Sequence, residues 1–236
     1  MNKKADSSEN VVKLKQGSSA DAPARRKGIY LLPNLLTTGA LFAGFYAVLS
    51  GFTGQFELAA IAIFAAMIFD GLDGRVARMT NTQSDFGVQY DSLSDMVSFG
   101  VAPAVVAYGW GVSDLGKLGL AAAFVYASCA ALRLARFNVQ AESSDGKVFT
   151  GLPSPAAAAL VAGFVWSTYE LAPSVALSVL GAVLTAAAGL LMVSNFKYPS
   201  FKEVDLRGKV PFIVILSVVL GFVVITIDPP RILFML

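Results

Sequence analysis

The sequence contains no histidine and one cysteine, Cys129, and only 14% of its 236 residues are charged. The absence of histidine excludes a histidine general base, a Ser-His-Asp triad and a His/Cys zinc site. A lone cysteine cannot form an internal disulfide. Any bound metal ion must therefore be held through oxygen atoms, which favours Mg²⁺, Mn²⁺ or Ca²⁺ over zinc or copper.

The sequence is rich in apolar residues, which form long hydrophobic runs. Apolar residues make up 56% of the chain and the mean hydropathy is +0.65, whereas a soluble domain is roughly 45–50% apolar. Runs long enough to cross a bilayer as a helix cover residues 31–51, 57–78, 91–112, 117–138, 153–171, 174–194 and 210–227, and residues 232–236 begin an incomplete eighth. We therefore predict an all-α fold, a polytopic transmembrane helix bundle.

The basic residues are distributed unevenly between the two sides of these spans. If the N-terminus is cytoplasmic, all lysines and arginines except Lys117 and Arg231 fall on the cytoplasmic side, the bias that sets orientation in membranes. Residues 1–28 are polar and basic without a signal-peptide core, so we expect a disordered cytoplasmic tail before a membrane domain at 29–236. Orientation and attraction to anionic membrane lipid explain the basic charge, and no nucleic-acid partner is predicted.

The most unusual stretch runs from Asp70 to Asp95, where apolar sequence is interrupted by Asp70, Asp73, Asp91 and Asp95. Asp70 and Asp73 are three residues apart, and Asp91 and Asp95 are four apart, so each pair lies on one face of its helix. Ionised groups beside hydrocarbon are costly and usually mark a functional site. Four carboxylates that face each other need cations to stay ionised together. We therefore predict a metal site, which the predicted topology places at the cytoplasmic boundary.

Several fixed residues accompany these aspartates. The stretch reads Asp70-Gly71-x-Asp73-Gly74-x-x-Ala77-Arg78, then eight residues, then Gly87-x-x-x-Asp91-x-x-x-Asp95. This pattern resembles the signature of the CDP-alcohol phosphotransferase family, integral membrane enzymes that join an alcohol to a phosphatidyl group taken from a CDP-linked lipid. The resemblance implies a six-helix catalytic core followed by one or two C-terminal helices.

The resemblance also implies roles for individual residues. Two divalent cations, Mg²⁺ or Mn²⁺, would neutralise charge on the attacking and leaving oxygens. One ion is expected on Asp70, Asp73 and Asp91, and the second on Asp70, Asp91 and Asp95. Asp95 is also the expected general base, which takes the proton of the attacking hydroxyl. The residues expected to contact the CDP-linked lipid are Asn34, Thr37, Gly74, Ala77, Arg78, Ser84 and Gly87.

Some of these residues also have a purely structural interpretation. The small side chains of Gly74 and Ala77 would let a flat base approach the backbone, or would let two helices pack closely. Asn34 and Thr37 follow a proline that is typical of a helix start. The planar, charged side chain of Arg78 suits a pyrophosphate.

The acceptor alcohol depends on other segments. Residues 29–49, 133–140 and 151–159 resemble the bacterial membrane-integral phosphatidylserine synthases, a similarity that extends over nearly all of residues 29–230. It implies transfer from CDP-diacylglycerol to L-serine with release of CMP, in a multi-pass homodimer of the bacterial inner membrane whose active site faces the cytoplasm. The expected acceptor contacts are Arg133, Arg136 and Asn138, because the two arginines share a helix face and suit a carboxylate or phosphate.

Alternatives remain open at this level. Glycerol 3-phosphate and inositol phosphate carry an extra phosphate that Arg133 and Arg136 would also bind, and both arginines would also serve as interfacial anchors. Intramembrane carboxylates would suit a cation transporter, although its charges belong near the bilayer midplane. An inactive scaffold is disfavoured because no signature residue is missing. Ser154 is expected to cap a helix, with Pro155 as its first residue.

Overall fold

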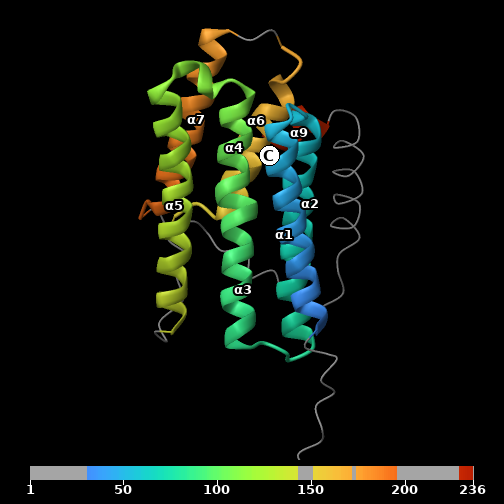
Figure 1. Ribbon diagram of the computed structural model, residues 1–236. Coiled ribbons are helices and arrows are strands. Elements are labelled where there is room, and N and C mark those ends of the chain that lie inside the picture. Colours follow the sequence, from blue (N-terminus) through green and yellow to red (C-terminus); the bar gives the residue numbers. More distant parts are fainter. Residues whose placement is uncertain (1–30, 143–150, 172–173, 196–228, 236) are drawn as a thin grey trace, which may run out of the picture.

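The computed structural model describes residues 31–142, 151–171, 174–195 and 229–235, and every regular element in these ranges is a helix (Figure 1). The elements are α1 (Leu31–Phe52), α2 (Phe56–Met79), α3 (Asp85–Asp95), the π-helical η2 (Met96–Val101), α4 (Ala102–Trp110), the 3₁₀ turn η3 (Val112–Leu115), α5 (Lys117–Glu142), α6 (Ser154–Thr168), α7 (Val175–Val193) and α9 (Pro229–Met235). The predicted all-α helix bundle is confirmed. The expected tail at 1–28 and the expected span at 210–227 lie outside the described residues.

The predicted spans differ from the observed helices in two places. The third span, predicted from 91, begins earlier at Asp85, because Ser84 caps the helix by accepting a hydrogen bond from the Gly87 backbone N–H at 3.1 Å. The incomplete eighth span, predicted at 232–236, is the seven-residue helix α9, which packs on α6. A helix of this length is too short to cross a bilayer.

The composition of the helices is that of a membrane protein. Helices α1, α5 and α7 are long and apolar enough to cross a membrane. Many large apolar side chains on the outside of the bundle are exposed, among them Phe42 at 67%, Phe124 at 70% and Val183 at 59%. Water would disfavour so much exposed apolar surface, and lipid accommodates it.

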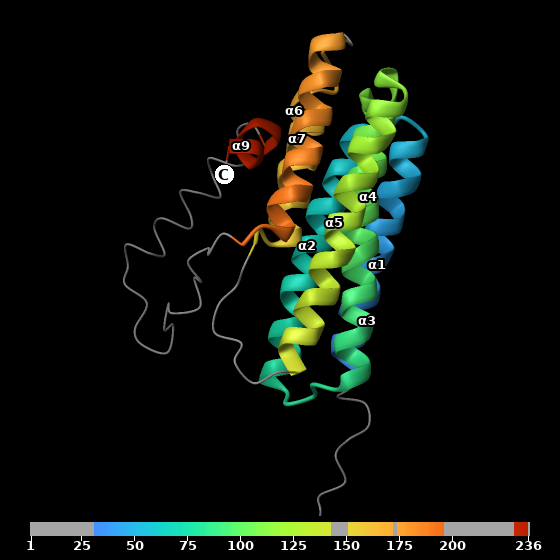
Figure 2. The same cartoon turned by 90° about the vertical axis from the view of Figure 1, so that its left-hand side faces the viewer.

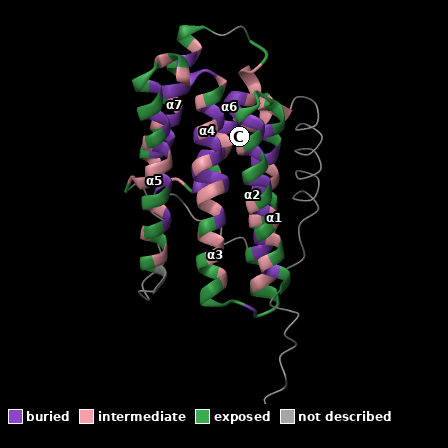
Figure 3. Ribbon diagram, in the orientation of Figure 1, coloured by how far each residue is buried: buried purple, intermediate pink, exposed green. Residues whose placement is uncertain are grey.

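The helices do not all reach the same level. Figures 1 and 2 show α3, η2 and α4 joined end to end in one continuous helix, which we call the central rod. In both views α6 begins and α7 ends well above the lower end of the bundle, whereas α1, α2, α3 and α5 continue to that end. Buried residues concentrate in the upper part of the bundle, where α6 and α7 are present, and the lower ends of α3 and α5 are largely exposed (Figure 3). The lower end is therefore the open part of the fold.

Small and hydroxyl side chains fix the register between α1 and the central rod. A Cβ added at Gly44 would lie 2.6 Å from the Ser98 Cα, so only glycine allows this approach. The Ser98 hydroxyl donates to the Ala40 carbonyl at 3.0 Å, and the Ser94 hydroxyl donates to the Thr37 carbonyl at 3.1 Å. Small residues of α1 thus pack within the chain, and they set where the aspartates of α3 lie relative to α1.

The π-helical segment η2 follows directly after Asp95. Segments of this kind are frequent at functional sites because they re-aim the side chains next to them. The hydroxyl of Tyr126, on α5, is fully buried and donates to the Phe99 carbonyl at 2.9 Å. This hydrogen bond links η2 to α5 and stabilises the segment that carries Asp95.

Candidate active site

Three of the four aspartates meet in a compact cluster. Asp70 of α2 and Asp91 and Asp95 of α3 each offer a carboxylate oxygen, and these oxygens lie within 4.8 Å of one another. All three side chains are partly buried. Carboxylate oxygens at such spacing suit a hard divalent cation. The structure thus brings together the three residues predicted for the second metal ion.

Asp73 lies beside this cluster and is more buried, with 5% of its surface exposed. The Thr37 hydroxyl, on α1, donates to Asp73 Oδ2 at 2.6 Å. Asp73 repels both Asp91 and Asp95 electrostatically. Such repulsion among partly buried carboxylates is relieved by cations, which supports the metal site expected from the sequence.

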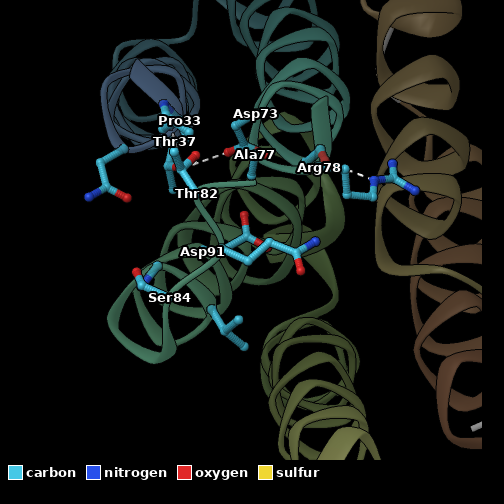
Figure 4. A pocket seen from close by; sticks show the side chains of 13 residues that line it. Pro33, Thr37, Asp73, Ala77, Arg78, Thr82, Ser84 and Asp91 are labelled. Atoms are coloured by element: carbon cyan, nitrogen blue, oxygen red, sulfur yellow. Dashed lines mark hydrogen bonds between the residues drawn. The ribbon is translucent and has the colours of Figure 1, made fainter. Parts of the chain in front are cut away.

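A cavity of about 340 Å³ adjoins the aspartates between α1, α2 and the start of α3 (Figure 4). Pockets of this size accommodate small ligands. Asp73 and Asp91 belong to its wall, so the cavity and the acidic cluster are continuous. The wall also contains every residue predicted to contact the CDP-linked lipid, namely Asn34, Thr37, Gly74, Ala77, Arg78, Ser84 and Gly87.

The surroundings of Gly74 bear on its two interpretations, contact with a flat ligand or close packing of helices. Among the described residues, no atom of a neighbouring element lies within 4 Å of a Cβ added at Gly74. A role in helix packing would require a close neighbour, and the described residues provide none, which favours the ligand-contact interpretation of Gly74. Gly74 instead leaves open space in the wall of the cavity. A Cβ at Gly87 would lie 3.2 Å from Ser84 Oγ and 3.7 Å from Asn34 Oδ1, so that side of the cavity is narrow.

Arg78 lines the cavity but its charged end is directed outward. Its Nε donates to the Gly74 carbonyl of the preceding turn at 2.9 Å. In Figure 4 the guanidinium points away from Asp91. A phosphate-binding role for Arg78 therefore requires the side chain to rotate toward the cavity.

Sequence reasoning missed several residues of the cavity wall. Thr82 and Gln83 lie in the connection between α2 and α3, and Pro33 and Val88 complete the wall on α1 and α3. Thr82 is buried, and its hydroxyl lies 2.7 Å from that of Thr80. The signal for the connection was weak, because Thr82 and Gln83 belong to the eight residues between the two halves of the motif, which the pattern does not specify.

The predicted acceptor residues lie on α5. Nη1 of Arg133 donates to Ser154 Oγ at 2.8 Å, while its buried Nε has no hydrogen-bond partner in the part of the chain that the structure describes. Arg133 is also attracted electrostatically to Asp95. Arg136 donates from Nη2 to Asn195 Oδ1 at 3.1 Å, just after α7. The expected capping role of Ser154 is wrong: α6 begins at Ser154 itself, and its hydroxyl binds Arg133 instead.

Asn138 faces α3 rather than open space. Its Oδ1 accepts a hydrogen bond from the Ser92 hydroxyl at 3.1 Å, and its Nδ2 donates to Gln89 Oε1 at 3.4 Å. Ser92 and Gln89 flank Asp91 in the sequence. Asn138 therefore connects α5 to the helix that carries two of the clustered aspartates.

The comparison with a protein family and the comparisons with individual proteins agree with one another. The model of the CDP-alcohol phosphatidyltransferase family matches residues 30–194, which contain the acidic cluster and the cavity. A CDP-diacylglycerol–serine O-phosphatidyltransferase from Helicobacter pylori is 40% identical over 198 residues, which cover 83% of each chain. One from Bacillus subtilis is 35% identical over 73% of this chain and 92% of its own. An archaetidylserine synthase from Methanothermobacter thermautotrophicus is 37% identical over 71% of this chain and 69% of its own.

Proposed function

The chain belongs to the CDP-alcohol phosphatidyltransferase family, and we propose that it transfers the phosphatidyl group of CDP-diacylglycerol to the hydroxyl of L-serine, forming phosphatidylserine and CMP. One observation carries this proposal: the carboxylates of Asp70, Asp91 and Asp95 converge beside a cavity lined by every residue expected to bind the CDP-linked lipid. The relatives named CDP-diacylglycerol–serine O-phosphatidyltransferase support serine as the acceptor.

Two divalent cations, Mg²⁺ or Mn²⁺, are the proposed cofactors. The donor set fits them, because it consists of carboxylate oxygens close enough together to share an ion. Asp70, Asp91 and Asp95 would hold one ion, and Asp73 would join Asp70 and Asp91 around the other. When bound, such ions neutralise charge on the phosphate oxygens during displacement.

The cavity between α1 and α3 is the proposed nucleotide site. Asn34 and Thr37 form its wall on α1, and Gly74 and Ala77 leave room for a flat base against α2. Arg78 would exchange its hydrogen bond to the Gly74 carbonyl for the pyrophosphate, a stronger, charge-assisted partner. The acyl chains of the lipid would remain in the bilayer beside the apolar outer faces of the helices.

The serine hydroxyl is the proposed nucleophile, and no enzyme nucleophile is needed. Asp95 takes the hydroxyl proton, the serine oxygen forms a bond to the phosphatidyl phosphorus, and the bond from that phosphorus to the CMP oxygen breaks. CMP leaves with the electron pair of that bond. Arg133 is the proposed partner of the serine carboxylate, and Arg136 and Asn138 complete this side of the site.

The acceptor assay tests the assignment directly. Purified protein in detergent receives CDP-diacylglycerol, Mn²⁺ and one of three radiolabelled acceptors: L-serine, glycerol 3-phosphate or inositol phosphate. We expect CMP and labelled phosphatidylserine with serine only, and neither product from an Asp95→Asn control. A labelled lipid from either phosphorylated acceptor, without phosphatidylserine, would overturn the choice of serine while leaving the reaction class intact.

The orientation and oligomeric state are also proposals. The bias of lysine and arginine supports an inner-membrane protein whose acidic cluster faces the cytoplasm. In a Cys129→Ala background, a cysteine introduced at Gln83 should react with a membrane-impermeant maleimide in inverted vesicles and not in intact spheroplasts. Light scattering of the detergent-solubilised protein should give the mass of a homodimer, and a monomeric mass would refute that part.

A further inference from the structure

The Arg133 side chain is held by a residue of a different helix. Its Nη1 donates to Ser154 Oγ at 2.8 Å, and only 1% of the Ser154 surface is exposed. We propose that Ser154 is a positioning residue whose hydroxyl keeps the Arg133 guanidinium away from Asp95 and available to the acceptor. This inference rests on the proposed function, because that function gives Arg133 a carboxylate to bind.

The charge of Arg133 is attracted to Asp95 of the acidic cluster. Arg133 and Asp95 attract each other, yet no direct ion pair within 4.0 Å joins Arg133 to a carboxylate in the described part of the chain. The Arg133 Nε is buried, and no hydrogen-bond partner for it lies among the described residues. An unpaired buried donor is unfavourable, and opposite charges attract more strongly where water is excluded. A guanidinium free to rotate would therefore close onto Asp95.

The chain before Ser154 fixes the position of its hydroxyl. The Leu152 backbone N–H donates to the Leu191 carbonyl at 3.0 Å, which attaches this turn to the end of α7. Gly151 has a φ of 88°, and a Cβ there would collide with the Met192 carbonyl oxygen. Because the turn that leads into Ser154 is attached to α7, its hydroxyl can restrain a flexible arginine on α5.

Loss of the hydroxyl should have two consequences that share one cause. Arg133 would turn away from the acceptor, so the KM for serine should rise by about tenfold, as expected for a lost hydrogen bond to a charged group. Arg133 would also pair with Asp95 and compete with a cation for that carboxylate, so the Kd for Mn²⁺ should rise severalfold. The KM for CDP-diacylglycerol should stay unchanged, because the nucleotide cavity lies between α1, α2 and α3.

A double-mutant cycle separates this role from a general structural one. The wild type, Ser154→Ala, Arg133→Ala and the double variant are compared by the KM for serine and, in metal-free protein, by Mn²⁺ titration followed by electron paramagnetic resonance. We expect Ser154→Ala to change both quantities in the wild type and neither in the Arg133→Ala background. An equal effect of Ser154→Ala in both backgrounds, or no effect in the wild type, would overturn the proposal.

Two further variants make the experiment decisive. Ser178→Ala is the matched control, because Ser178 is also buried, at 3% exposed, but lies on α7 at a distance from Arg133; it should leave both quantities unchanged. Ser154→Cys keeps the size of the side chain and replaces the hydroxyl by a weak acceptor, so it gives the same test if the alanine variant does not fold. If the wild type makes no phosphatidylserine, the proposed function fails, and the Mn²⁺ titrations still decide whether Ser154 restrains Arg133.

Discussion

Helix α1 meets the central rod in two different ways along its length. In its middle, Gly44 lies so close to Ser98 that a single Cβ would lie 2.6 Å from the Ser98 Cα. Near its start, Asn34 and Thr37 line a cavity of about 340 Å³ that lies between α1, α2 and the start of α3. The two regions are less than three helical turns apart on one helix.

The difference shows that a glycine acquires its role from what faces it. Gly44 faces the backbone of the rod and allows close packing, whereas Gly74 faces open space and leaves room for a ligand. Gly74 belongs to the aspartate motif and Gly44 does not, yet the sequence alone left open whether Gly74 contacts a ligand or packs against a helix. The closely packed region around Gly44 and Ser98, which we call the closed region, fixes the register of α3. In the region beside the cavity, which we call the open region, this register places the aspartates next to the cavity.

The largest expected effect concerns the open region. Asp95→Asn removes the proposed general base and one carboxylate of the cluster, so turnover should fall by about a thousandfold or more. The closed region is untouched, and the loss of one negative charge relieves repulsion, so the unfolding temperature in detergent should not decrease. The measurement is CMP release at saturating serine, and turnover near that of the wild type would refute the role of Asp95.

The second prediction tests the closed region. Gly44→Ala places a methyl group against the Ser98 backbone, and overpacking of this kind costs about 1–3 kcal/mol of unfolding free energy. Chemical unfolding in detergent, monitored by circular dichroism, measures this loss. Gly71→Ala is the control for stability, since the structure shows no neighbour within 4 Å of the added Cβ among the described residues. Equal stability of the two variants would contradict the comparison.

The third prediction reverses the pattern. Gly74→Ala should keep or raise stability, because alanine favours a helix over glycine by roughly 0.5–1 kcal/mol and no atom of the described neighbours lies within 4 Å of its methyl group. The same methyl group would protrude into the nucleotide cavity, so the KM for CDP-diacylglycerol should rise by about tenfold while the KM for serine stays the same. A Gly74→Ala variant with reduced stability and unchanged KM would show that Gly74 serves packing after all.

The sequence was sufficient for most of this arrangement. The hydrophobic runs located α1, α2, α5, α6 and α7, because length and apolarity are local properties. The residues that line the cavity followed from the resemblance to the CDP-alcohol phosphotransferase family. Spacing by itself predicted only that the aspartates of each pair share a helix face. The first turns of α3 were missed. Residues 85–95 are more polar than the other helices, and a search for apolar runs does not detect a helical segment of this composition.

Contacts between distant segments could not be predicted from the sequence. Ser154 follows Arg133 by 21 residues, and its local sequence is typical of a helix cap, so nothing in the sequence indicated that its hydroxyl binds an arginine. Asn138 was expected to contact the acceptor, and only the packing of α5 against α3 shows that it binds Ser92 and Gln89. Both contacts depend on how helices are placed in space.

The smallest expected effect lies where the two regions join, at Thr37. Its carbonyl accepts from Ser94 in the closed region, and its hydroxyl donates to Asp73 in the open one. Thr37→Val keeps the shape and the carbonyl but leaves the buried Asp73 without this donor, which should cost about 1 kcal/mol of stability in metal-free protein. With Mn²⁺ bound, the cation takes over as the partner of Asp73, so kcat/KM should fall only about two- to fivefold. Thr37→Ser retains the hydroxyl and should match the wild type, whereas a hundredfold loss in Thr37→Val would show that the hydroxyl contributes far more to the reaction than one hydrogen bond to Asp73.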